Sequence, residues 1–365
     1  MELLTRPLGT SGMQITQVGF GAWAIGGGDW AYGWGSQDDT DSVAAIKHAI
    51  ASGINWVDTA AVYGLGHSEE VVGRALREIL AADRPFVFTK GGQVGDPTRP
   101  FAEPQHNLRP ESIRKEIEAS LRRLGVERID LYQFHWPDNI GTPIEESWGE
   151  MANLIKEGKV RAGGVSNFDV GLLERAERVR HVDSLQPPFS LIHRQSGADV
   201  IPWSAAHGTG VIAYSPMQSG ILTDAFSHAR VDRMDGNDWR RRNPEFREPL
   251  LSRNLALRDA LRPIASSRRF GLWRSEYSRV RARCRGSGCP PARPLRQCSC
   301  CPRTGRARSA DLPSSSPRRV AGWCAPCLTS QRRCVKWQRH VSLSLAGGSP
   351  SQFTRSSGWL GFTQM

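Results

Sequence analysis

Short apolar segments alternate with amphipathic segments between residues 15 and 265, and this alternation constrains the fold more than any other feature. Apolar runs bounded by turn residues are typical of buried strands, and apolar residues that recur every three to four positions are typical of helices. The pattern predicts strands over 15–23, 54–58, 86–90, 129–135, 160–166, 184–186 and 211–214. It predicts helices over 41–52, 68–80, 110–124, 144–157, 170–179, 196–208 and 254–265.

Strands that alternate with helices at this spacing indicate an α/β protein with a parallel sheet and right-handed crossovers. No glycine-rich phosphate motif follows the first strand, so the pattern favours a (β/α)8 TIM barrel over a doubly wound sheet. The Pro7-Leu8-Gly9 segment and Gly12 precede the first strand and indicate a small hairpin that caps the bottom of the barrel.

Polar side chains stand where the predicted strands end. Asp58, Lys90 and His135 each terminate an apolar run, and Tyr63 lies in the loop after Asp58. Taken singly, each has an ordinary interpretation: a helix cap, a packed ring, a solvated cation or a core histidine. In a barrel, however, all four would meet at the carboxyl-terminal face, where catalytic residues lie. Four titratable groups in these positions therefore predict a catalytic site.

A series of short motifs resembles the aldo-keto reductase family, in the family's order and spacing. The motifs are Gly53–Ala60 with Tyr63-Gly64 and His67-Ser68-Glu69, Thr89-Lys90, Asp130–Pro137, Gly164–Phe168, Gln186-Pro187, Ala213–Met217 and Ser219-Gly220. The resemblance covers residues 1 to about 267 and is nearest to bacterial members related to potassium-channel β subunits and general stress reductases. It implies an NADP-dependent oxidoreductase that reduces an aldehyde or ketone.

The resemblance also implies roles for the four strand-end residues. Tyr63 would be the general acid, although tyrosine is a weak acid with an ordinary pKa of roughly 10. A neighbouring Lys90 ammonium would ease ionisation of the phenol, and Asp58 would hold Lys90 charged and in place. His135 would orient the substrate oxygen and assist proton transfer. Channel β subunits carry Asn at the position of His135, so His135 favours an enzyme over a non-catalytic, cofactor-sensing regulatory subunit.

The cofactor implied by the resemblance is NADP(H), and no metal site is implied within the barrel. Residues of the later strand ends would contact it: Ser166, Asn167 and Gln186 at the carboxamide, Tyr214 against the ring, and Ser215, Met217 and Gly220 near the pyrophosphate. Plain alternatives exist, because Ser and Asn also cap helices and a tyrosine at a strand end is often simply buried. In the loop over 222–255, the Arg240-Arg241-Arg242 run could meet phosphates or could be solvated.

Composition changes abruptly after residue 267. The chain has a net charge of +12 and eight cysteines, and all eight cysteines follow Arg283. Beyond residue 267 Glu276 and Asp311 are the only acids among many Arg, Ser and Pro residues, whereas the preceding part is net acidic. We therefore divide the chain into an incomplete aldo-keto reductase barrel over 1–267 and a basic tail over 268–365.

The composition of the tail is compatible with four interpretations. The tail could be an out-of-frame translation, a zinc site of Cys298-x2-Cys301 and Cys324-x2-Cys327, a nucleic-acid-binding arm, or a disulfide module. The frameshifted C-terminus is favoured, because the eighth strand, the last helix and the Gly-x-Arg segment that grips the adenosine 2′-phosphate are missing where the family has them. The barrel would then have two unpaired edges, with Val341–Leu345 as the best substitute strand, and the chain would be poorly soluble.

The remaining expectations concern partners and location. The partner would be a small-molecule carbonyl substrate, with no nucleic acid expected, because the positive charge belongs to the tail. The N-terminus lacks the apolar run of a signal peptide, no segment approaches a membrane-spanning length, and the barrel part contains no cysteine. These features favour a cytoplasmic protein without a membrane partner. The sequence gives no indication of oligomeric state.

Overall fold

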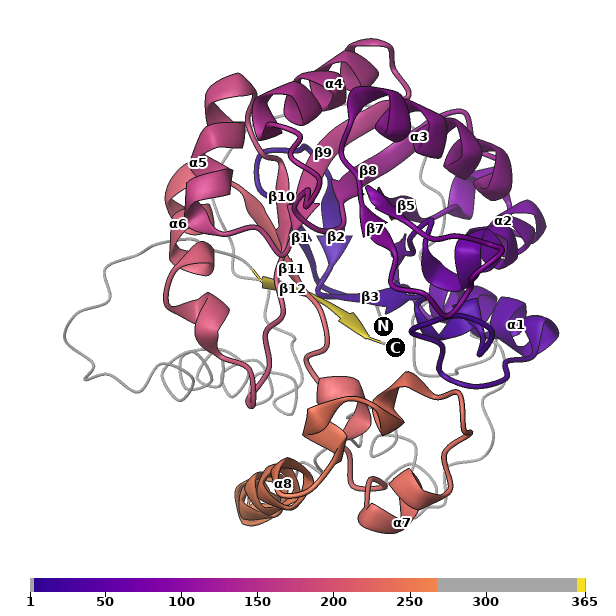
Figure 1. The fold of residues 1–365 in the computed structure, drawn as a ribbon, viewed down its shortest axis with the longest axis vertical. Coiled ribbons are helices and arrows are strands. Elements are labelled where there is room, and N and C mark those ends of the chain that lie inside the picture. The colour runs from indigo at the N-terminus through magenta and orange to yellow at the C-terminus, as the bar shows by residue number, and fades with distance from the viewer. Residues whose placement is uncertain (1–2, 268–359, 365) are drawn as a thin grey trace, which may run out of the picture. The chain divides into compact units, whose positions relative to one another are not determined.

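The computed structural model describes residues 3–267 and 360–364, which form a closed barrel of parallel strands surrounded by helices (Figure 1). The strands in barrel order are β10 (Ser184–Gln186), β11 (Gly210–Ala213), β12 (Leu360–Gln364), β3 (Val18–Gly21), β4 (Trp56–Asp58), β5 (Phe86–Gly91), β8 (Ile129–Phe134) and β9 (Val160–Ser166). Each adjacent pair is parallel, so all the strands end at one face. The predicted (β/α)8 architecture is confirmed.

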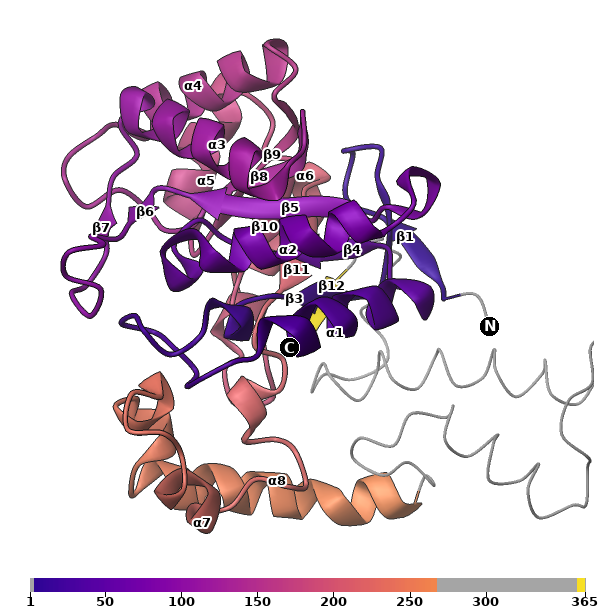
Figure 2. The same cartoon turned by 90° about the vertical axis from the view of Figure 1, so that its right-hand side faces the viewer.

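Most helices lie on the outside of the barrel, between successive strands (Figure 2). They are α1 (Asp39–Ala51), α2 (His67–Glu78), α3 (Pro110–Leu124), α4 (Ile144–Lys156), α5 (Val170–Val179) and α6 (Val200–His207). By contrast, α7 (His228–Asp232) and α8 (Leu250–Ser267) belong to the long segment after β11 and stand apart from the barrel wall. The starts of the helices follow local chemistry: the side chains of Asp38 and Asp169 accept backbone N–H bonds as N-caps of α1 and α5. Within the described part of the chain, no helix is long and apolar enough to cross a membrane.

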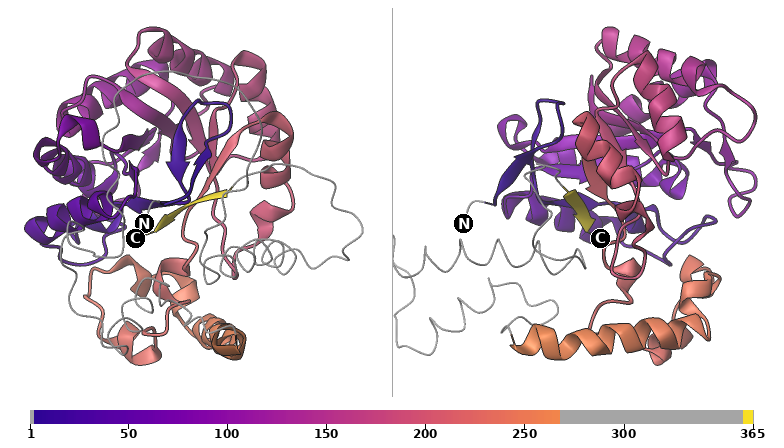
Figure 3. Two further views of the ribbon diagram at one scale, coloured as in Figure 1. Left: turned by 180° about the vertical axis from the view of Figure 1, so that it is seen from behind. Right: turned by 90° about the vertical axis from the view of Figure 1, so that its left-hand side faces the viewer.

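The eighth strand position corrects one expectation of the sequence analysis, that the barrel would have two unpaired edges, since a tail segment other than the suggested Val341–Leu345 takes this position. The backbone of β12 lies between β11 and β3, with Leu360 opposite Val211 and Phe362 opposite Val18 (Figure 3). The two strands flanking this position each present unpaired N–H and C=O groups, and any extended backbone can satisfy them. The sequence did not single out this segment because ladder pairing requires no particular side chains.

Several predictions about the tail concern residues outside the described range. They are the substitute strand Val341–Leu345, the missing last helix and Gly-x-Arg segment, the zinc cysteines and the frameshift itself. The boundary near residue 267 also stays a prediction. A reading of the nucleotide sequence in the two other frames near codon 268 would test the frameshift directly.

A two-stranded antiparallel hairpin of β1 (Thr5–Pro7) and β2 (Gln14–Thr16) closes one end of the barrel. The first predicted strand was too long, since Ile15 belongs to this hairpin and β3 begins only at Val18. The hairpin is packed against the lower interior of the barrel through one buried apolar cluster of Leu8, Met13, Ile15, Trp56, Phe88, Leu131, Ala162 and Ile212. The predicted cap at the barrel bottom is confirmed.

At the opposite face a second short hairpin pairs β6 (Gln93–Val94) with β7 (Gln105–His106). The sequence analysis did not predict it, because two-residue strands leave no apolar periodicity. Gln93 and His106 line the cavity described below, so this hairpin forms part of its wall.

Candidate active site

Asp58, Tyr63, Lys90 and His135 meet at the carboxyl ends of the strands, as the sequence predicted. The Lys90 ammonium is buried and donates to Asp58 Oδ2 at 2.5 Å, to the Thr59 carbonyl at 2.9 Å and to Tyr63 Oη at 3.3 Å. The ring of His135 lies edge-on to that of Tyr63, with centroids 5.5 Å apart. Lys90 therefore joins the carboxylate to the phenol, and the imidazole stands beside the phenol ring.

The Asp58 carboxylate is held by more than the lysine. Its Oδ1 accepts from Gln186 Nε2 at 3.0 Å and from Gln133 Nε2 at 3.3 Å. Gln186 was expected at the cofactor carboxamide, and it lines the cavity, but its amide nitrogen is directed to Asp58. Gln133 was missed, although its place two residues after the inward-facing Leu131 was a usable signal.

Burial is the largest influence on the titration of these groups. It raises the pKa of Tyr63, with Asp58 adding to the effect and Lys90 opposing it. Lys90 therefore acts on Tyr63 in the expected direction, but burial outweighs it and the phenol keeps its proton. Burial alone would lower the pKa of Lys90, yet Asp58 and Tyr63 together raise it, so the ammonium stays charged.

His135 is neutral in this site. Burial, followed by the Lys90 ammonium and His106, holds the pKa of His135 well below its usual range. Its Nδ1 is buried and has no hydrogen-bond partner within the described residues. A neutral imidazole carries one N–H donor and one bare nitrogen, so it can orient a substrate oxygen without adding charge.

A chain of hydrogen bonds links the ends of β9, β10 and β11. Ser166 Oγ donates to the Gln186 carbonyl at 2.8 Å, Asn167 Nδ2 donates to Ser166 Oγ at 3.0 Å, and Tyr214 Oη donates to Asn167 Oδ1 at 2.9 Å. The helix-cap interpretation of Ser166 and Asn167 is wrong, because Asp169 is the N-cap of α5. The Ser166–Asn167 pair instead faces the cavity.

The turn after β11 has an unusual backbone. Ser215, Gln218, Ser219 and Gly220 all have positive φ, at 51°, 48°, 49° and 100°. The turn is closed by its own backbone hydrogen bonds, since the Gln218 amide donates to the Ser215 carbonyl at 2.9 Å and the Gly220 amide to the Met217 carbonyl at 3.2 Å. Together with Met217 these residues line the cavity, and their contact with a cofactor pyrophosphate stays a prediction.

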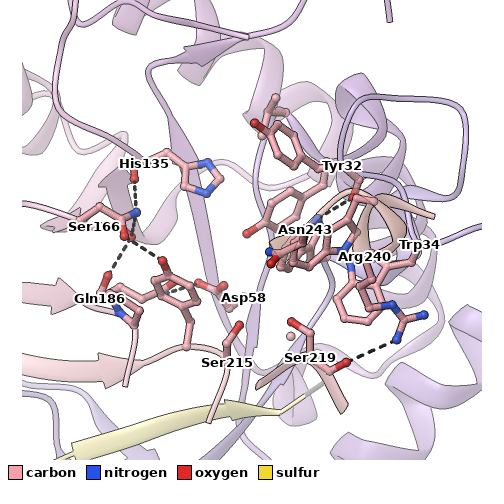
Figure 4. A pocket seen from close by; sticks show the side chains of 18 of the residues that line it. Tyr32, Trp34, Asp58, His135, Ser166, Gln186, Ser215, Ser219, Arg240 and Asn243 are labelled. Atoms are coloured by element: carbon pink, nitrogen blue, oxygen red, sulfur yellow. Dashed lines mark hydrogen bonds between the residues drawn. The ribbon is translucent and has the colours of Figure 1, made fainter. Parts of the chain in front are cut away.

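Most of these residues border one cavity of about 780 Å³, whereas Lys90 and Gln133 lie behind its wall and contact Asp58. Figure 4 shows Asp58, His135, Ser166 and Gln186 on one side of it, with Tyr32, Trp34 and Arg240 opposite. The opposite wall is aromatic: Trp23 stacks on Trp239 at 5.0 Å and lies 6.2 Å from the Tyr63 ring. The sequence analysis missed this wall, because Trp23 was assigned to the end of a strand and Trp239 lies in a loop far along the chain.

The arginine run in the long loop is mostly structural. Arg240 is buried, paired with Asp238 Oδ2 at 2.6 Å, and placed 4.3 Å above the Trp34 ring. Arg242 donates to the Ala31 carbonyl, which joins this loop to the loop after β3. The solvated interpretation is therefore wrong for Arg240, and a contact with phosphate stays a prediction. In residues 3–267 and 360–364 no cluster of three or more His, Cys, Asp or Glu could hold a metal ion.

Comparison with known proteins agrees with this geometry. The family model described as aldo/keto reductase family matches residues 17–272. The chain belongs to the aldo-keto reductase family. Members of this family use nicotinamide cofactors.

This aldo-keto reductase has both sequence and structural relatives. It is 34% identical to the aldo-keto reductase YhdN of Bacillus subtilis over 258 residues, which are 71% of this chain and 75% of the relative. The NADH-specific methylglyoxal reductase of Escherichia coli is 37% identical over 234 residues, 62% of this chain and 71% of the relative. A glycerol dehydrogenase structure from Gluconobacter oxydans is 38% identical with a TM-score of 0.65, covering 74% of this chain and 81% of that one.

Proposed function

We propose that this chain reduces an aldehyde or ketone to the alcohol, with NADPH as hydride donor and Tyr63 as proton donor. The observation that carries the proposal is the buried Lys90 ammonium, which contacts Asp58 at 2.5 Å and the Tyr63 hydroxyl at 3.3 Å, while Asp58 and Tyr63 themselves line the cavity. This arrangement stabilises a phenolate only once Tyr63 has given up its proton.

The proposed reduction combines a hydride transfer from the cofactor with a proton transfer from Tyr63. The reduced nicotinamide, when bound, supplies a hydride to the carbonyl carbon. Tyr63 gives its proton to the carbonyl oxygen as negative charge develops there, and Lys90 stabilises the phenolate that remains. Asp58 keeps Lys90 charged and fixed, and His135 orients the oxygen through its N–H. Solvent then returns a proton to Tyr63 after the alcohol leaves.

The names of two relatives indicate a first substrate panel. One is a methylglyoxal reductase and another a glycerol dehydrogenase, so small three-carbon carbonyl compounds are the first candidates. The assay is oxidation of the reduced cofactor by the purified full chain across this panel and a set of larger aldehydes. The aromatic wall of Trp23 and Trp239 admits flat apolar groups, so aromatic aldehydes belong in the panel.

Tyr63→Phe tests the assigned role. We expect it to lower the rate of reduction by about 10²–10⁴-fold, the usual contribution of a general acid. Tyr214→Phe is the matched control, because it also removes one cavity hydroxyl but not the proposed proton donor, and it should stay within tenfold of the parent. A Tyr63→Phe variant as active as the control would remove Tyr63 from the role.

The choice of NADPH has its own test. The family segment that grips the 2′-phosphate was not found in the sequence, and charge-assisted hydrogen bonds contribute about 1.5–3 kcal/mol each. Loss of two would weaken NADPH binding by very roughly 10²–10⁴-fold. Fluorescence titration of the full chain with NADPH and NADH measures both affinities; a micromolar Kd for NADPH with normal turnover would contradict the expected impairment.

If the full chain proves inactive, a fusion of residues 1–267 to the C-terminal segment of an intact family member separates two explanations. Reduction by the fusion, abolished by Tyr63→Phe, would place the defect in the tail. A fusion that binds the cofactor tightly without turnover would instead favour the cofactor-sensing regulatory subunit.

A further inference from the structure

The last residues of β5 connect the catalytic side chains through the backbone. The Lys90 carbonyl accepts from the Ala61 amide at 3.0 Å, in the loop that carries Tyr63. The next carbonyl, that of Gly91, accepts from the His135 amide at 2.9 Å. The position of the chain from Lys90 to Gly92 therefore sets where the ammonium, the phenol and the imidazole lie relative to one another.

One carboxylate holds this segment from outside the barrel. Both oxygens of Glu116, on α3, lie on the Gly92 amide nitrogen, at 3.1 and 3.0 Å. Gly92 has a φ of 81°, which favours glycine, and its carbonyl accepts from the Asn107 amide at 3.0 Å. Gly92 is thus fixed on both sides, and Glu116 is the charged side chain that fixes it.

The surroundings of Glu116 give its charge little support. No basic side chain within the described residues forms an ion pair with it, since Arg123 is bound at 2.6 Å to the fully buried Glu69 of α2. The buried Tyr132 hydroxyl, on β8, and Glu116 both lie next to Gly91. A Cβ atom built on Gly91 would be 1.9 Å from Tyr132 Oη and 3.3 Å from Glu116 Oε2. On α3 itself, Ser112 Oγ donates weakly at 3.5 Å.

These surroundings make Glu116 an unfavourable residue for stability alone. Burial raises the pKa of Glu116 to about 7, the Gly92 amide and Ser112 oppose this, and Glu69 adds to it more than Arg123 relieves it. A partly buried carboxylate without a cation is a cost to the fold. Such a group next to a reactive site is a candidate for a functional role.

We propose that Glu116 is a positioning residue for the reduction: by holding the Gly92 amide it fixes the end of β5, and so keeps the Lys90 ammonium within reach of Tyr63. Glu116 does not line the cavity, so it acts through the backbone and touches neither substrate nor cofactor. The catalytic consequence rests on the proposed function, but the hold on the backbone can be measured without turnover.

The first test uses the full chain with Glu116→Gln and Glu116→Ala, and Glu118→Gln as the matched control. Glu118 is on the same helix but pairs with Lys159 and has no hydrogen bond to β5. Amide hydrogen exchange should accelerate at least tenfold at Gly92 and at His135 in Glu116→Ala, with Glu116→Gln between it and the parent. Lys90, fully buried in the parent, should also become reactive toward formaldehyde with borohydride, detected by mass spectrometry.

The second test is the pH profile of reduction. Protonation of Glu116 weakens its hold on Gly92, so the rate of the parent should fall as pH drops through about 7. Glu116→Gln should run several-fold slower at pH 8 and lack this acid limb, with little change in KM. Because the folded-state pKa of Glu116 is raised to about 7, the parent loses stability as pH rises from the unfolded pKa of ~4.3 to about 7, so Glu116→Gln should not melt lower than the parent at pH 8.

The outcomes separate the possibilities. Parental exchange and parental Lys90 reactivity in Glu116→Ala would overturn the proposal, as would an active Glu116→Gln with an unchanged acid limb. Faster exchange at all amides with a lower melting temperature in Glu116→Gln would show a merely structural role and would also overturn it. If the parent shows no reduction, the proposed function fails by itself, and amide exchange and Lys90 reactivity still decide whether Glu116 holds this segment.

Discussion

The barrel interior has two layers of opposite character, built by the same strands. Trp56, Phe88 and Leu131 fill the lower layer with the hairpin cap. Two residues further along each strand stand Asp58, Lys90 and Gln133, because side chains at i and i+2 face the same side. Two residues along each strand, the interior therefore changes from packed apolar side chains to a hydrogen-bonded ion pair.

The two layers contribute differently, because the lower one stabilises the fold and the upper one carries the reactive groups. The lower layer removes apolar surface from water, which is the main favourable contribution to folding. The upper layer buries the Lys90–Asp58 pair, whose desolvation offsets much of its attraction, so it adds little net stability. The same strands thus supply a stabilising lower layer and a reactive upper layer. Variants in the lower layer should lose stability and keep activity, and variants in the upper layer should lose activity and keep stability.

The largest effect is expected from removing the charges of the upper layer together. Asp58→Asn with Lys90→Met should lower the rate of reduction by about 10²–10⁴-fold, since Tyr63 loses the cation that stabilises its phenolate. Folding stability should stay close to that of the parent or rise, because replacing a whole buried pair is often neutral or stabilising. Urea unfolding and steady-state kinetics on the same sample measure both. A variant that unfolds readily would show that the upper layer is also structural.

The reverse pattern is expected in the lower layer. Trp56→Ala should cost about 3–5 kcal/mol of unfolding free energy, because the ring is fully buried and its indole N–H donates to the Thr16 carbonyl at 2.9 Å. Activity per folded molecule should change little. Trp136→Ala, at a ring with 37% of its surface exposed, is the control and should lose far less stability. Equal losses in the two variants would contradict the layered interpretation.

His135 should make stability depend on pH in the upper layer. Its folded-state pKa is held well below the usual value, so the unfolded chain binds a proton that the folded chain does not. Stability from this source is present above pH ~6.5 and is lost as pH falls below that value. Chemical denaturation between pH 8 and 5 should show a smaller loss for His135→Asn than for the parent. Parallel curves would mean that His135 binds its proton equally well in the folded and unfolded chain.

The smallest effect is expected on the surface. Lys47 pairs with Glu78 at 2.6 Å between α1 and α2, but the two side chains are 42% and 53% exposed. Lys47→Ala should change the unfolding free energy by less than about 1 kcal/mol. Urea unfolding in low and high salt tests this, and a loss as large as that of Trp56→Ala would be inconsistent with solvent screening.

Most of the barrel could be read from the sequence because its signals are local. The helix over Pro110–Leu124 was predicted at its observed bounds, since Ile113, Ile117 and Leu124 recur at helical spacing and all are buried. The four strand-end residues were predicted by combining strand ends with a barrel. What the sequence could not give depends on contacts between distant segments, such as the Gln133–Asp58 bond and the hold of Glu116 on Gly92.

The pairing of β12 with β3 has a consequence for the course of folding. Both pairings of β12, with β3 and with β11, join segments that are far apart in the chain, whereas the other neighbouring strands of the described barrel follow one another closely in sequence. The entropy lost on closing a loop grows with its length, and contacts that are distant in sequence form slowly. The other seven strands can thus assemble first as an open, curved sheet with two free edges. Until the ring closes, those edges can pair with another molecule, so the yield of native protein should fall as the concentration during refolding rises.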